Sequence, residues 1–342
     1  MERRPGLDPA VAEVRRAVRA AIAEPDGPLV VALSGGPDSL ALAAATAFEA
    51  SRRGIPVEAV VIDHGLQEGS DAVAARAAEA ARALGLTARV VRVDVGRGDG
   101  PEAAAREARY TGLARAARDV GAETVLLGHT LDDQAETVLL GLARGSGAAS
   151  LAGMAAERRD AAGVRWLRPL LSVRRRTTVA ACAAEGVDPW TDPHNADPAF
   201  ARVRVRDRVL PVLEDELGPG VTEALARTAE QLREDAEAFQ DMIDETIEDI
   251  VEHADAGISI SVAALAANPA AIRNRVIRYV VESEFGVGLT RAQTVEVARL
   301  VTDWRGQGPI DLPGCLARRV NARVEIVARS PLPSVGEDGD DA

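Results

Sequence analysis

The first 130 residues alternate short β-branched runs with alanine-rich segments of helical length. Strands are predicted at 29–33, 57–62, 88–93 and 124–127. Helices are predicted between them, at 38–52, 70–84 and 101–119. Apolar strands joined by helices are typical of a parallel sheet that is buried on both faces. The sequence therefore predicts an α/β fold, built on an open parallel sheet with helices on both faces.

Further helices are predicted on either side of this alternation. The pair Asp8-Pro9 suits the start of a helix that runs to about Glu24. After the fourth strand, helices are expected at 132–144 and 172–185, with the strand-like "RWLRPLL" between them. These additions extend the same α/β domain.

A break at "LGPG", Leu217 to Gly220, separates this region from a second, smaller one. Beyond it, apolar residues recur at steps of three and four, which predicts a long amphipathic helix whose other face is acidic and solvated. Two helical patterns follow at 261–284 and 290–303, and then a terminal β-hairpin with its turn at Asn321-Ala322. We expect an α/β domain, an acidic connecting helix, a mainly helical domain with that hairpin, and a disordered tail, at 1–216, 217–256, 257–330 and 331–342.

Composition places the chain among globular proteins. Its 342 residues are 47% hydrophobic, which is enough for a sizeable core in two domains. No apolar run approaches the roughly 20 residues of a membrane helix, and the N-terminus lacks the apolar centre of a signal peptide. We therefore expect a cytoplasmic protein without a membrane partner. Cys182 and Cys315 form no C-x-x-C pair, which argues against a disulfide framework, an iron–sulfur centre or a zinc site.

The net charge of −13 is concentrated in one segment. Residues 214–255 hold 15 acidic residues against two arginines, so the rest of the chain is neutral overall. Outside the acidic segment, residues 161–184 carry five arginines and no acidic residue, which is compatible with a surface that binds RNA. All 40 cationic side chains are arginine. Because the chain has no lysine, any amine nucleophile must come from a substrate.

The stretch "LSGGPDS" joins the first predicted strand to the following helix. Ligands bind at such helix starts in open α/β sheets, because the free N–H groups there attract phosphate. The two glycines let backbone amides approach an anion, the two serines can donate hydroxyl hydrogen bonds, and the aspartate either caps the helix or holds Mg2+. A plain strand-to-helix turn is the alternative, and a Walker A loop is excluded because it needs a lysine. The candidate residues are Ser34, Gly35, Gly36, Pro37, Asp38 and Ser39.

Two further strings end the second and fourth predicted strands. "VVIDHGL" places Ile62 and His64 beside the loop, as a candidate wall for a nucleotide. In "GHTLDDQAET", His129, Asp133 and Glu136 are four and three residues apart, so they share one face if the helix starts early enough. Carboxylates beside a phosphate loop suit a cation, either a metal ion or a substrate ammonium. The alternative is that the two adjacent aspartates only cap the helix.

Together these strings resemble the tRNA(Ile)-lysidine synthetases, a family of N-type ATP pyrophosphatases with a PP-loop. The loop is followed by "DHGL", "EAAAREARY", "GHTLDDQAETVLL", "RGSG" and "WTDPHNADPAFARVRVR" in that family's order and spacing, over roughly residues 28–215. The resemblance implies a Rossmann-like, ATP-binding catalytic domain and a C-terminal tRNA-recognition domain. It also implies conversion of the wobble cytidine of a CAU-anticodon tRNA(Ile) into lysidine, with ATP, Mg2+ and free L-lysine.

Matching positions carry roles over from the family. The loop at 34–39 would bind pyrophosphate, Asp38 would place it with Mg2+, and Asp133 and Glu136 would bind the ammonium of lysine. His129 and Arg109 would line the same site. The cytosine carbonyl oxygen would attack the α phosphorus of ATP, and the lysine ε-amine would then displace AMP. Since that amine has a pKa near 10.4, it must first lose a proton, with His129 or a carboxylate as acceptor.

Two arginine-rich stretches are candidate tRNA contacts. The first lies at a helix start, where cations oppose the helix dipole. Arginines of the second alternate along the chain, so they share one face if the segment is extended and spread over two faces if it is helical. They are Arg174, Arg175 and Arg176 in the first stretch, and Arg202, Arg204 and Arg206 in the second.

Other readings of the sequence stay open. Gln67 stands where the family often has arginine, and Arg202-Val203 where it often has Arg-Asn, so the resemblance implies no charge role at position 67. The enzyme alternatives are tRNA sulfur transferases, NAD or GMP synthetases and argininosuccinate synthetases, although unpaired cysteines argue against sulfur transfer. A non-catalytic nucleotide- or RNA-binding relative is a further alternative, and a homodimer is possible.

Overall fold

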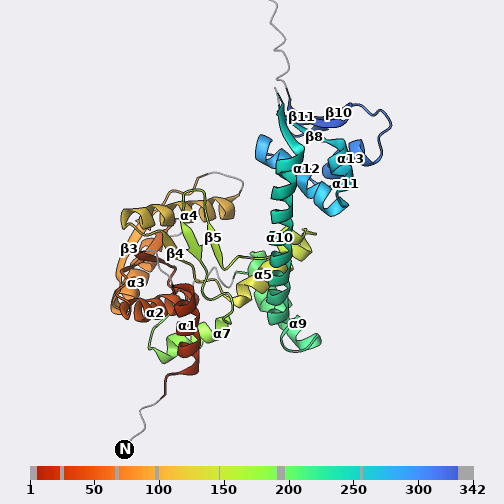
Figure 1. Ribbon diagram of the computed structural model, residues 1–342. Coiled ribbons are helices and arrows are strands. Elements are labelled where there is room, and N and C mark those ends of the chain that lie inside the picture. Colours follow the sequence, from red (N-terminus) through yellow and green to blue (C-terminus); the bar gives the residue numbers. More distant parts are fainter. Residues whose placement is uncertain are drawn as a thin grey trace, which may run out of the picture. The chain divides into compact units, whose positions relative to one another are not determined.

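The computed structural model describes residues 6–23, 27–65, 69–96, 100–145, 147–190, 197–254 and 257–329. The chain divides into two compact units, Met1–Arg233 and Glu234–Ala342 (Figure 1). This division falls inside the long helix α10 (Val221–Ile250), whereas the sequence suggested borders at 216 and 256. Gln67 and the predicted disordered tail at 331–342 lie outside the described residues.

A six-stranded sheet forms the centre of the first unit (Figure 1). Its order is β3-β2-β1-β4-β6-β5, and every pair of neighbours is parallel except β5 and β6. The predicted open parallel sheet is thus confirmed, with one antiparallel edge strand that was not predicted. The strands are β1 (Leu29–Leu33), β2 (Val57–Asp63), β3 (Thr87–Arg92), β4 (Thr124–Leu126), β5 (Glu157–Arg159) and β6 (Arg165–Leu167).

Helices cover both faces of this sheet (Figure 1). Side chains of the buried strand β1 alternate between two cores, as the pleat requires. Leu29, Val31 and Leu33 pack with one group of helices, and Val30 and Ala32 with α4. That group is α1 (Pro9–Ala21), α2 (Pro37–Ser51), α3 (Ser70–Ala83) and α7 (Arg175–Ala184), opposite α4 (Pro101–Asp119). The unit also contains α5 (Leu131–Ala143), α6 (Ala148–Leu151), α8 (Ala201–Arg204), a π-helical turn (Val205–Val209) and α9 (Leu210–Glu216).

The second unit combines an antiparallel sheet with three helices beyond α10. The predicted hairpin is confirmed, with Asn321 at its turn in the left-handed region (φ 54°). Three more strands join it in the order β7-β8-β11-β10-β9. The elements are β7 (Val251–Ala254), β8 (Gly257–Ser261), α11 (Val262–Ala267), α12 (Ala270–Phe285), α13 (Arg291–Thr302), β9 (Ile310–Leu312), β10 (Cys315–Val320) and β11 (Arg323–Ala328).

Two predicted helices of this unit need correction. The acidic helix stops at Ile250, where strand β7 begins, instead of continuing to 256. The helix expected at 261–284 is two helices, because Pro269 lacks an N–H and disfavours helical geometry at Asn268. The described acidic residues of α10 from Glu230 to Glu248 are exposed, as predicted, whereas Glu223 is half-buried beside Arg174; Ile243 and Ile250 are buried. In the part of the chain that is described, no helix is long and apolar enough to cross a bilayer.

Candidate active site

The sheet order brings two of the predicted loops together. Strand β1 lies between β2 and β4. Helix α2, which follows β1, packs on one face of the sheet, and helix α4, which precedes β4, packs on the other. Such a change of face opens a crevice at the carboxyl ends of the strands, where α/β proteins bind ligands. Gly128, after β4, allows close approach, because a Cβ there would lie 3.1 Å from the backbone N of Ser39. The loop after β4 therefore packs directly against the start of α2.

The loop at 34–39 forms a compact turn held by the Ser39 hydroxyl. That oxygen accepts from the backbone N–H of Ser34 at 3.2 Å and donates to the carbonyl of Gly36 at 3.0 Å. Gly35 adopts φ +84°, and a Cβ there would meet Ala77 at 3.2 Å, so glycine is required. Because the first N–H groups of α2 have no helical partner, they can bind an anion.

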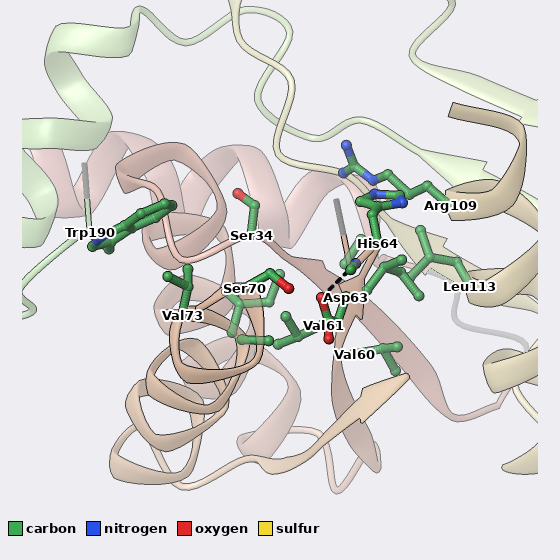
Figure 2. Close-up of a pocket in the computed structure, with 15 residues that line it drawn as sticks. Ser34, Val60, Val61, Asp63, His64, Ser70, Val73, Arg109, Leu113 and Trp190 are labelled. Atoms are coloured by element: carbon green, nitrogen blue, oxygen red, sulfur yellow. Dashed lines mark hydrogen bonds between the residues drawn. The ribbon is translucent and has the colours of Figure 1, made fainter. Parts of the chain in front are cut away.

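One cavity opens between β1, β2 and the start of α3 (Figure 2). It measures about 230 Å³ and has an apolar floor that includes Val60, Val61 and Leu113. Trp190 lies on one side of it, with His64 and Arg109 on the other (Figure 2). The predicted residues Ile62, His64, Ser34 and Arg109 all line this cavity. A largely apolar cavity with a few polar groups suits an aromatic ring.

A second cavity of about 500 Å³ adjoins the first and shares Ala32, Ser34, Arg109 and Trp190 with it. Its lining is far more charged. The structure here brings together residues from the loop, from the end of β4 and from both arginine stretches. The charged or polar residues are Ser34, Asp38, Ser39, Arg109, His129, Asp133, Arg175, Arg202 and Arg206.

Three carboxylates surround the guanidinium of Arg175. Its Nη2 lies 2.7 Å from Asp133 Oδ1, its Nη1 2.9 Å from Glu136 Oε1, and its Nε 3.2 Å from Asp38 Oδ2. Asp133 is 8% exposed and Glu136 is fully buried. Arg206 Nε also reaches Glu136 Oε1, at 2.9 Å. Glu136 Oε2 is buried without a hydrogen-bond partner among the described residues, and the Nε of Arg202 lies 3.6 Å from it.

Asp133 combines the two roles that the sequence left as alternatives. Its Oδ2 accepts from the backbone N–H of Thr130 at 2.7 Å and from the Thr130 hydroxyl at 2.8 Å, which caps α5. Its Oδ1 faces Arg175. Asp132 instead accepts from the backbone N–H of Arg175 at 2.7 Å, at the start of α7. His129 precedes the helix, which starts at Leu131, so the expected shared helical face holds for Asp133 and Glu136 alone.

The pKa values follow from burial and charge. Burial raises the pKa of Asp38 above its ordinary value. For Asp133, burial acts in the same direction, but Arg175 and the Thr130 hydrogen bonds outweigh it and lower the pKa. Burial would lower the pKa of Arg175, whereas the three carboxylates raise it, so it stays charged. Burial, aided by Arg109, lowers the pKa of His129 to about 3, so this imidazole is neutral at pH 7.

Arg109 is the cation that links the two cavities. In the described part of the chain it has no carboxylate partner within ion-pair distance, and burial lowers its pKa. Burial and Arg109 likewise lower the pKa of His64. Arg109 is half-buried, and a partly desolvated cation without a counter-charge attracts an anion. The boundary between the cavities is therefore suited to a negatively charged group.

The described residues do not form a resident metal site. No three His, Cys, Asp or Glu side chains among them converge as metal ligands. Both oxygens of Asp38 are engaged, Oδ1 by the Thr178 hydroxyl and Oδ2 by Arg175. Magnesium commonly takes one or two carboxylates and completes its shell with phosphate and water. The donor set thus fits an ion carried by a phosphate ligand, with Asp38 as its candidate carboxylate.

Comparisons with known proteins agree with this geometry. A PP-loop domain model matches residues 10–213, and a TilS substrate binding domain model matches residues 260–324. The tRNA(Ile)-lysidine synthase of Leifsonia xyli subsp. xyli is 58% identical over 299 residues, covering 87% of this chain and 89% of that protein. The chain belongs to the tRNA(Ile)-lysidine synthase family. The Thermobifida fusca member is 52% identical over 322 residues, covering 92% and 95%.

A solved structure outside the tRNA(Ile)-lysidine synthase family shares the fold. It is the U34-tRNA thiolase NcsA from Methanococcus maripaludis with its 4Fe-4S cluster. The match has a TM-score of 0.53 at 22% identity and covers 66% of this chain and 79% of that one. At that identity the likeness supports the PP-loop fold.

In this member of the lysidine synthase family, the two arginine stretches have different surroundings. The segment 201–209 is helical, so Arg202 and Arg206 point toward Glu136, while Arg204 is exposed. In the first stretch, Arg175 lies in the carboxylate cluster, whereas Arg176 is exposed. Arg174 lies 2.7 Å from Glu223 and 3.3 Å from Asp132. Assignment of all six arginines to tRNA stays a prediction, and the surroundings favour it most for Arg176 and Arg204.

Sequence reasoning missed three residues of the site. Arg175 was predicted as a tRNA contact, and its place among the three carboxylates was not foreseen. Trp190 was quoted in a motif without a role, but it walls both cavities. Thr178, which holds Asp38, lies one helical turn after Arg175. The spacing of Arg175 and Thr178 shows that they share one face of a helix, but the sequence does not show which elements pack against that face. Val203 was not among these missed residues. It stands where the family often has asparagine, and its side chain is buried.

Proposed function

We propose that the protein ligates L-lysine to carbon 2 of the wobble cytidine in the CAU anticodon of tRNA(Ile), forming lysidine. The cytosine carbonyl oxygen attacks the α phosphorus of ATP and pyrophosphate leaves. The lysine ε-amine then bonds to carbon 2, AMP leaves with the oxygen, and the amine loses its protons. Membership of the lysidine synthase family supports this reaction. The observation that carries it is the buried pair of carboxylates, Asp133 and Glu136, which hold the guanidinium of Arg175 beside the phosphate-binding loop.

The first cavity accounts for the base of ATP. Its apolar floor and Trp190 fit a purine ring, and the triphosphate would then extend past Ser34 to the start of α2. Arg109 faces both cavities and can contact a phosphate oxygen. Magnesium would arrive with the nucleotide, with Asp38 as its carboxylate ligand.

Replacement of Trp190 tests this placement of ATP. The Trp190→Ala variant removes the aromatic wall of the first cavity, and base–aromatic stacking is worth about 1–3 kcal/mol. We therefore expect the Kd of ATP to rise by about tenfold, measured by calorimetry with an uncleavable analogue. Trp304→Ala, at an exposed tryptophan of the second unit, is the matched control. Unchanged affinity in Trp190→Ala would argue against the base in this cavity.

The second cavity accounts for lysine. The guanidinium of Arg175 marks where Asp133 and Glu136 hold a cation, and an ammonium group has matching charge and donors. Since the pKa of His129 is about 3, this imidazole is a weak proton acceptor without ligands. Burial raises the pKa of Asp38, so among the cluster carboxylates it is the better candidate for taking the proton of the ε-amine.

The tRNA is proposed to contact exposed arginines of the first unit and the substrate-binding region at 260–324. Arg176 and Arg204 are the first-unit candidates, because their side chains are exposed beside the catalytic cavity residues Arg175 and Arg206. A cytoplasmic location belongs to the same proposal, because tRNA and ATP are found there. The homodimer remains a prediction.

Salt dependence tests the tRNA contacts. The double variant Arg176→Gln/Arg204→Gln should weaken tRNA binding and reduce the slope of log K against log salt by about 1 per lost phosphate contact. ATP affinity should not change. The control Arg16→Gln/Arg118→Gln removes equal charge from exposed positions on α1 and α4. Equal slopes for the two double variants would remove Arg176 and Arg204 from the interface.

The reaction itself is tested with labelled lysine, ATP, Mg2+ and a CAU-anticodon tRNA(Ile) transcript. We expect label in the tRNA together with lysine-dependent release of AMP. A tRNA(Met) transcript with the same anticodon is the control for substrate choice. Cleavage of ATP to AMP and pyrophosphate without label in the tRNA would favour another PP-loop synthetase.

The cysteines argue against sulfur transfer. Burial raises the pKa of the Cys182 thiol to about 11, and Cys315 is buried in the second unit. Thiolates are the reactive form, so neither thiol is activated. The Cys182→Ala/Cys315→Ala variant should retain lysidine formation within about threefold and lose about 1–2 kcal/mol of stability through lost packing. Loss of activity in a folded double variant would revive a thiol-based mechanism.

A further inference from the structure

Arg175 connects the nucleotide side of the site with the amine side. Its backbone N–H is fixed by Asp132, and its side chain contacts Asp38 at the start of α2 and both Asp133 and Glu136 on α5. Among the described residues, no other side chain contacts all three carboxylates. The main chain at Arg175 is thus fixed by Asp132, whereas its guanidinium is held only by ion pairs with the three carboxylates.

Formal charges show that the three carboxylates are already balanced by arginines without ligands. Asp38, Asp133 and Glu136 carry three negative charges, and Arg175, Arg202 and Arg206 lie within ion-pair distance of them. A lysine ammonium that enters beside Glu136 adds a positive charge to a buried, neutral cluster. Such a charge is costly to bury without a partner. Release of one resident cation from the carboxylates would remove this cost when lysine binds.

ATP offers that cation another partner. Arg175 lines the same cavity as Ser34, Gly36 and Ser39, where the phosphates are proposed to bind. A guanidinium pairs with phosphate through two N–H groups as readily as with a carboxylate. Arg202 and Arg206 are less suited to this exchange, because they contact Glu136 but not Asp38.

We propose that Arg175 makes lysine binding depend on bound ATP. Without nucleotide, its guanidinium occupies Asp133 and Glu136; with nucleotide, it turns to the phosphates and leaves both carboxylates to the ammonium of lysine. Arginine suits this place because its guanidinium stays protonated and cannot attack the adenylated base. The inference rests on the proposed function, since it takes lysine as the incoming amine.

Calorimetry of the full-length protein tests this coupling. Lysine is titrated with and without α,β-methylene-ATP and Mg2+, in the absence of tRNA. In the wild-type protein we expect the analogue to tighten lysine binding by about tenfold, within the usual range of coupling between sites. In Arg175→Gln, lysine should bind without the analogue at least as tightly as the wild type does with it, and the analogue should add less than about twofold.

Arg202→Gln is the matched control, because it removes a cation that contacts Glu136 at 3.6 Å but does not reach Asp38. It should retain the tenfold coupling. If Arg175→Gln does not fold, Arg175→Lys carries the test: one ammonium cannot span Asp38, Asp133 and Glu136 together, so the coupling should fall below that of the wild type.

Two outcomes overturn the proposal in different ways. Full coupling in Arg175→Gln or Arg175→Lys would show that another group links the ligands, while the lysine site would stand. Absence of lysine binding to the wild type in both conditions would contradict the lysine site together with the coupling. The labelled-lysine reaction separates these cases. Incorporation of lysine into tRNA should persist if another group links the ligands, and it should be absent if lysine does not bind at this site.

Discussion

Glu136→Gln is expected to lower kcat/KM for lysine by about 100-fold, because hydrogen bonds to charged groups are worth about 1.5–3 kcal/mol each. Glu136 is fully buried and accepts from both Arg175 and Arg206. The neutral amide keeps the size of the side chain but leaves these two guanidinium groups short of a counter-charge. Lysine incorporation into tRNA at saturating ATP measures the effect.

The same variant should lose about 3 kcal/mol in free energy of unfolding, since breaking a buried ion pair from one side leaves a buried charge uncompensated. Denaturant unfolding measures this loss. Glu123→Gln is the matched control, because Glu123 is exposed and directly precedes strand β4, which leads to the loop before α5. Equal stability and equal lysine kinetics in the two variants would exclude Glu136 from the site and from its supporting network.

Asp133→Asn should raise the KM for lysine by about 10- to 100-fold and affect kcat less, since it weakens a contact to bound substrate. The amide oxygen can replace Oδ2 in the cap of α5, so folding should be largely retained. The charge that faces Arg175 and the incoming ammonium is lost. Initial rates over a range of lysine concentrations provide the measurement.

The control for Asp133→Asn is the neighbouring variant Asp132→Asn. Asp132 accepts from the backbone of Arg175 and does not line the catalytic cavity. It should reduce stability modestly and leave the KM for lysine within about threefold of the wild type. A normal rate of lysidine formation by Asp133→Asn at limiting lysine would refute the ammonium-binding role.

Local patterns determined the first unit well. Strand β1 and helix α4 match their predicted bounds, and the loop at 34–39 was found from the string Ser-Gly-Gly-Pro-Asp-Ser between a predicted strand and a predicted helix. These features depend on nearest neighbours along the chain, through side-chain periodicity and helix-start chemistry. The second unit was harder. "GISIS" alternates as a strand should, but a five-residue run next to helical patterns is a weak signal, and β8 was missed.

The candidate site was only half determined by sequence. The residue types on each loop predicted phosphate and a cation, either a metal ion or a substrate ammonium, because spacing on one element is visible in the chain. The resemblance to the lysidine synthetases implied lysine as that amine. Which elements meet was decided by tertiary structure. Helix α7 places Arg175 beside carboxylates that lie 39 to 137 residues earlier in the chain, and its guanidinium is paired with them. A basic stretch reads the same in sequence whether it faces solvent or buried acids, since pairing across the fold depends on long-range packing.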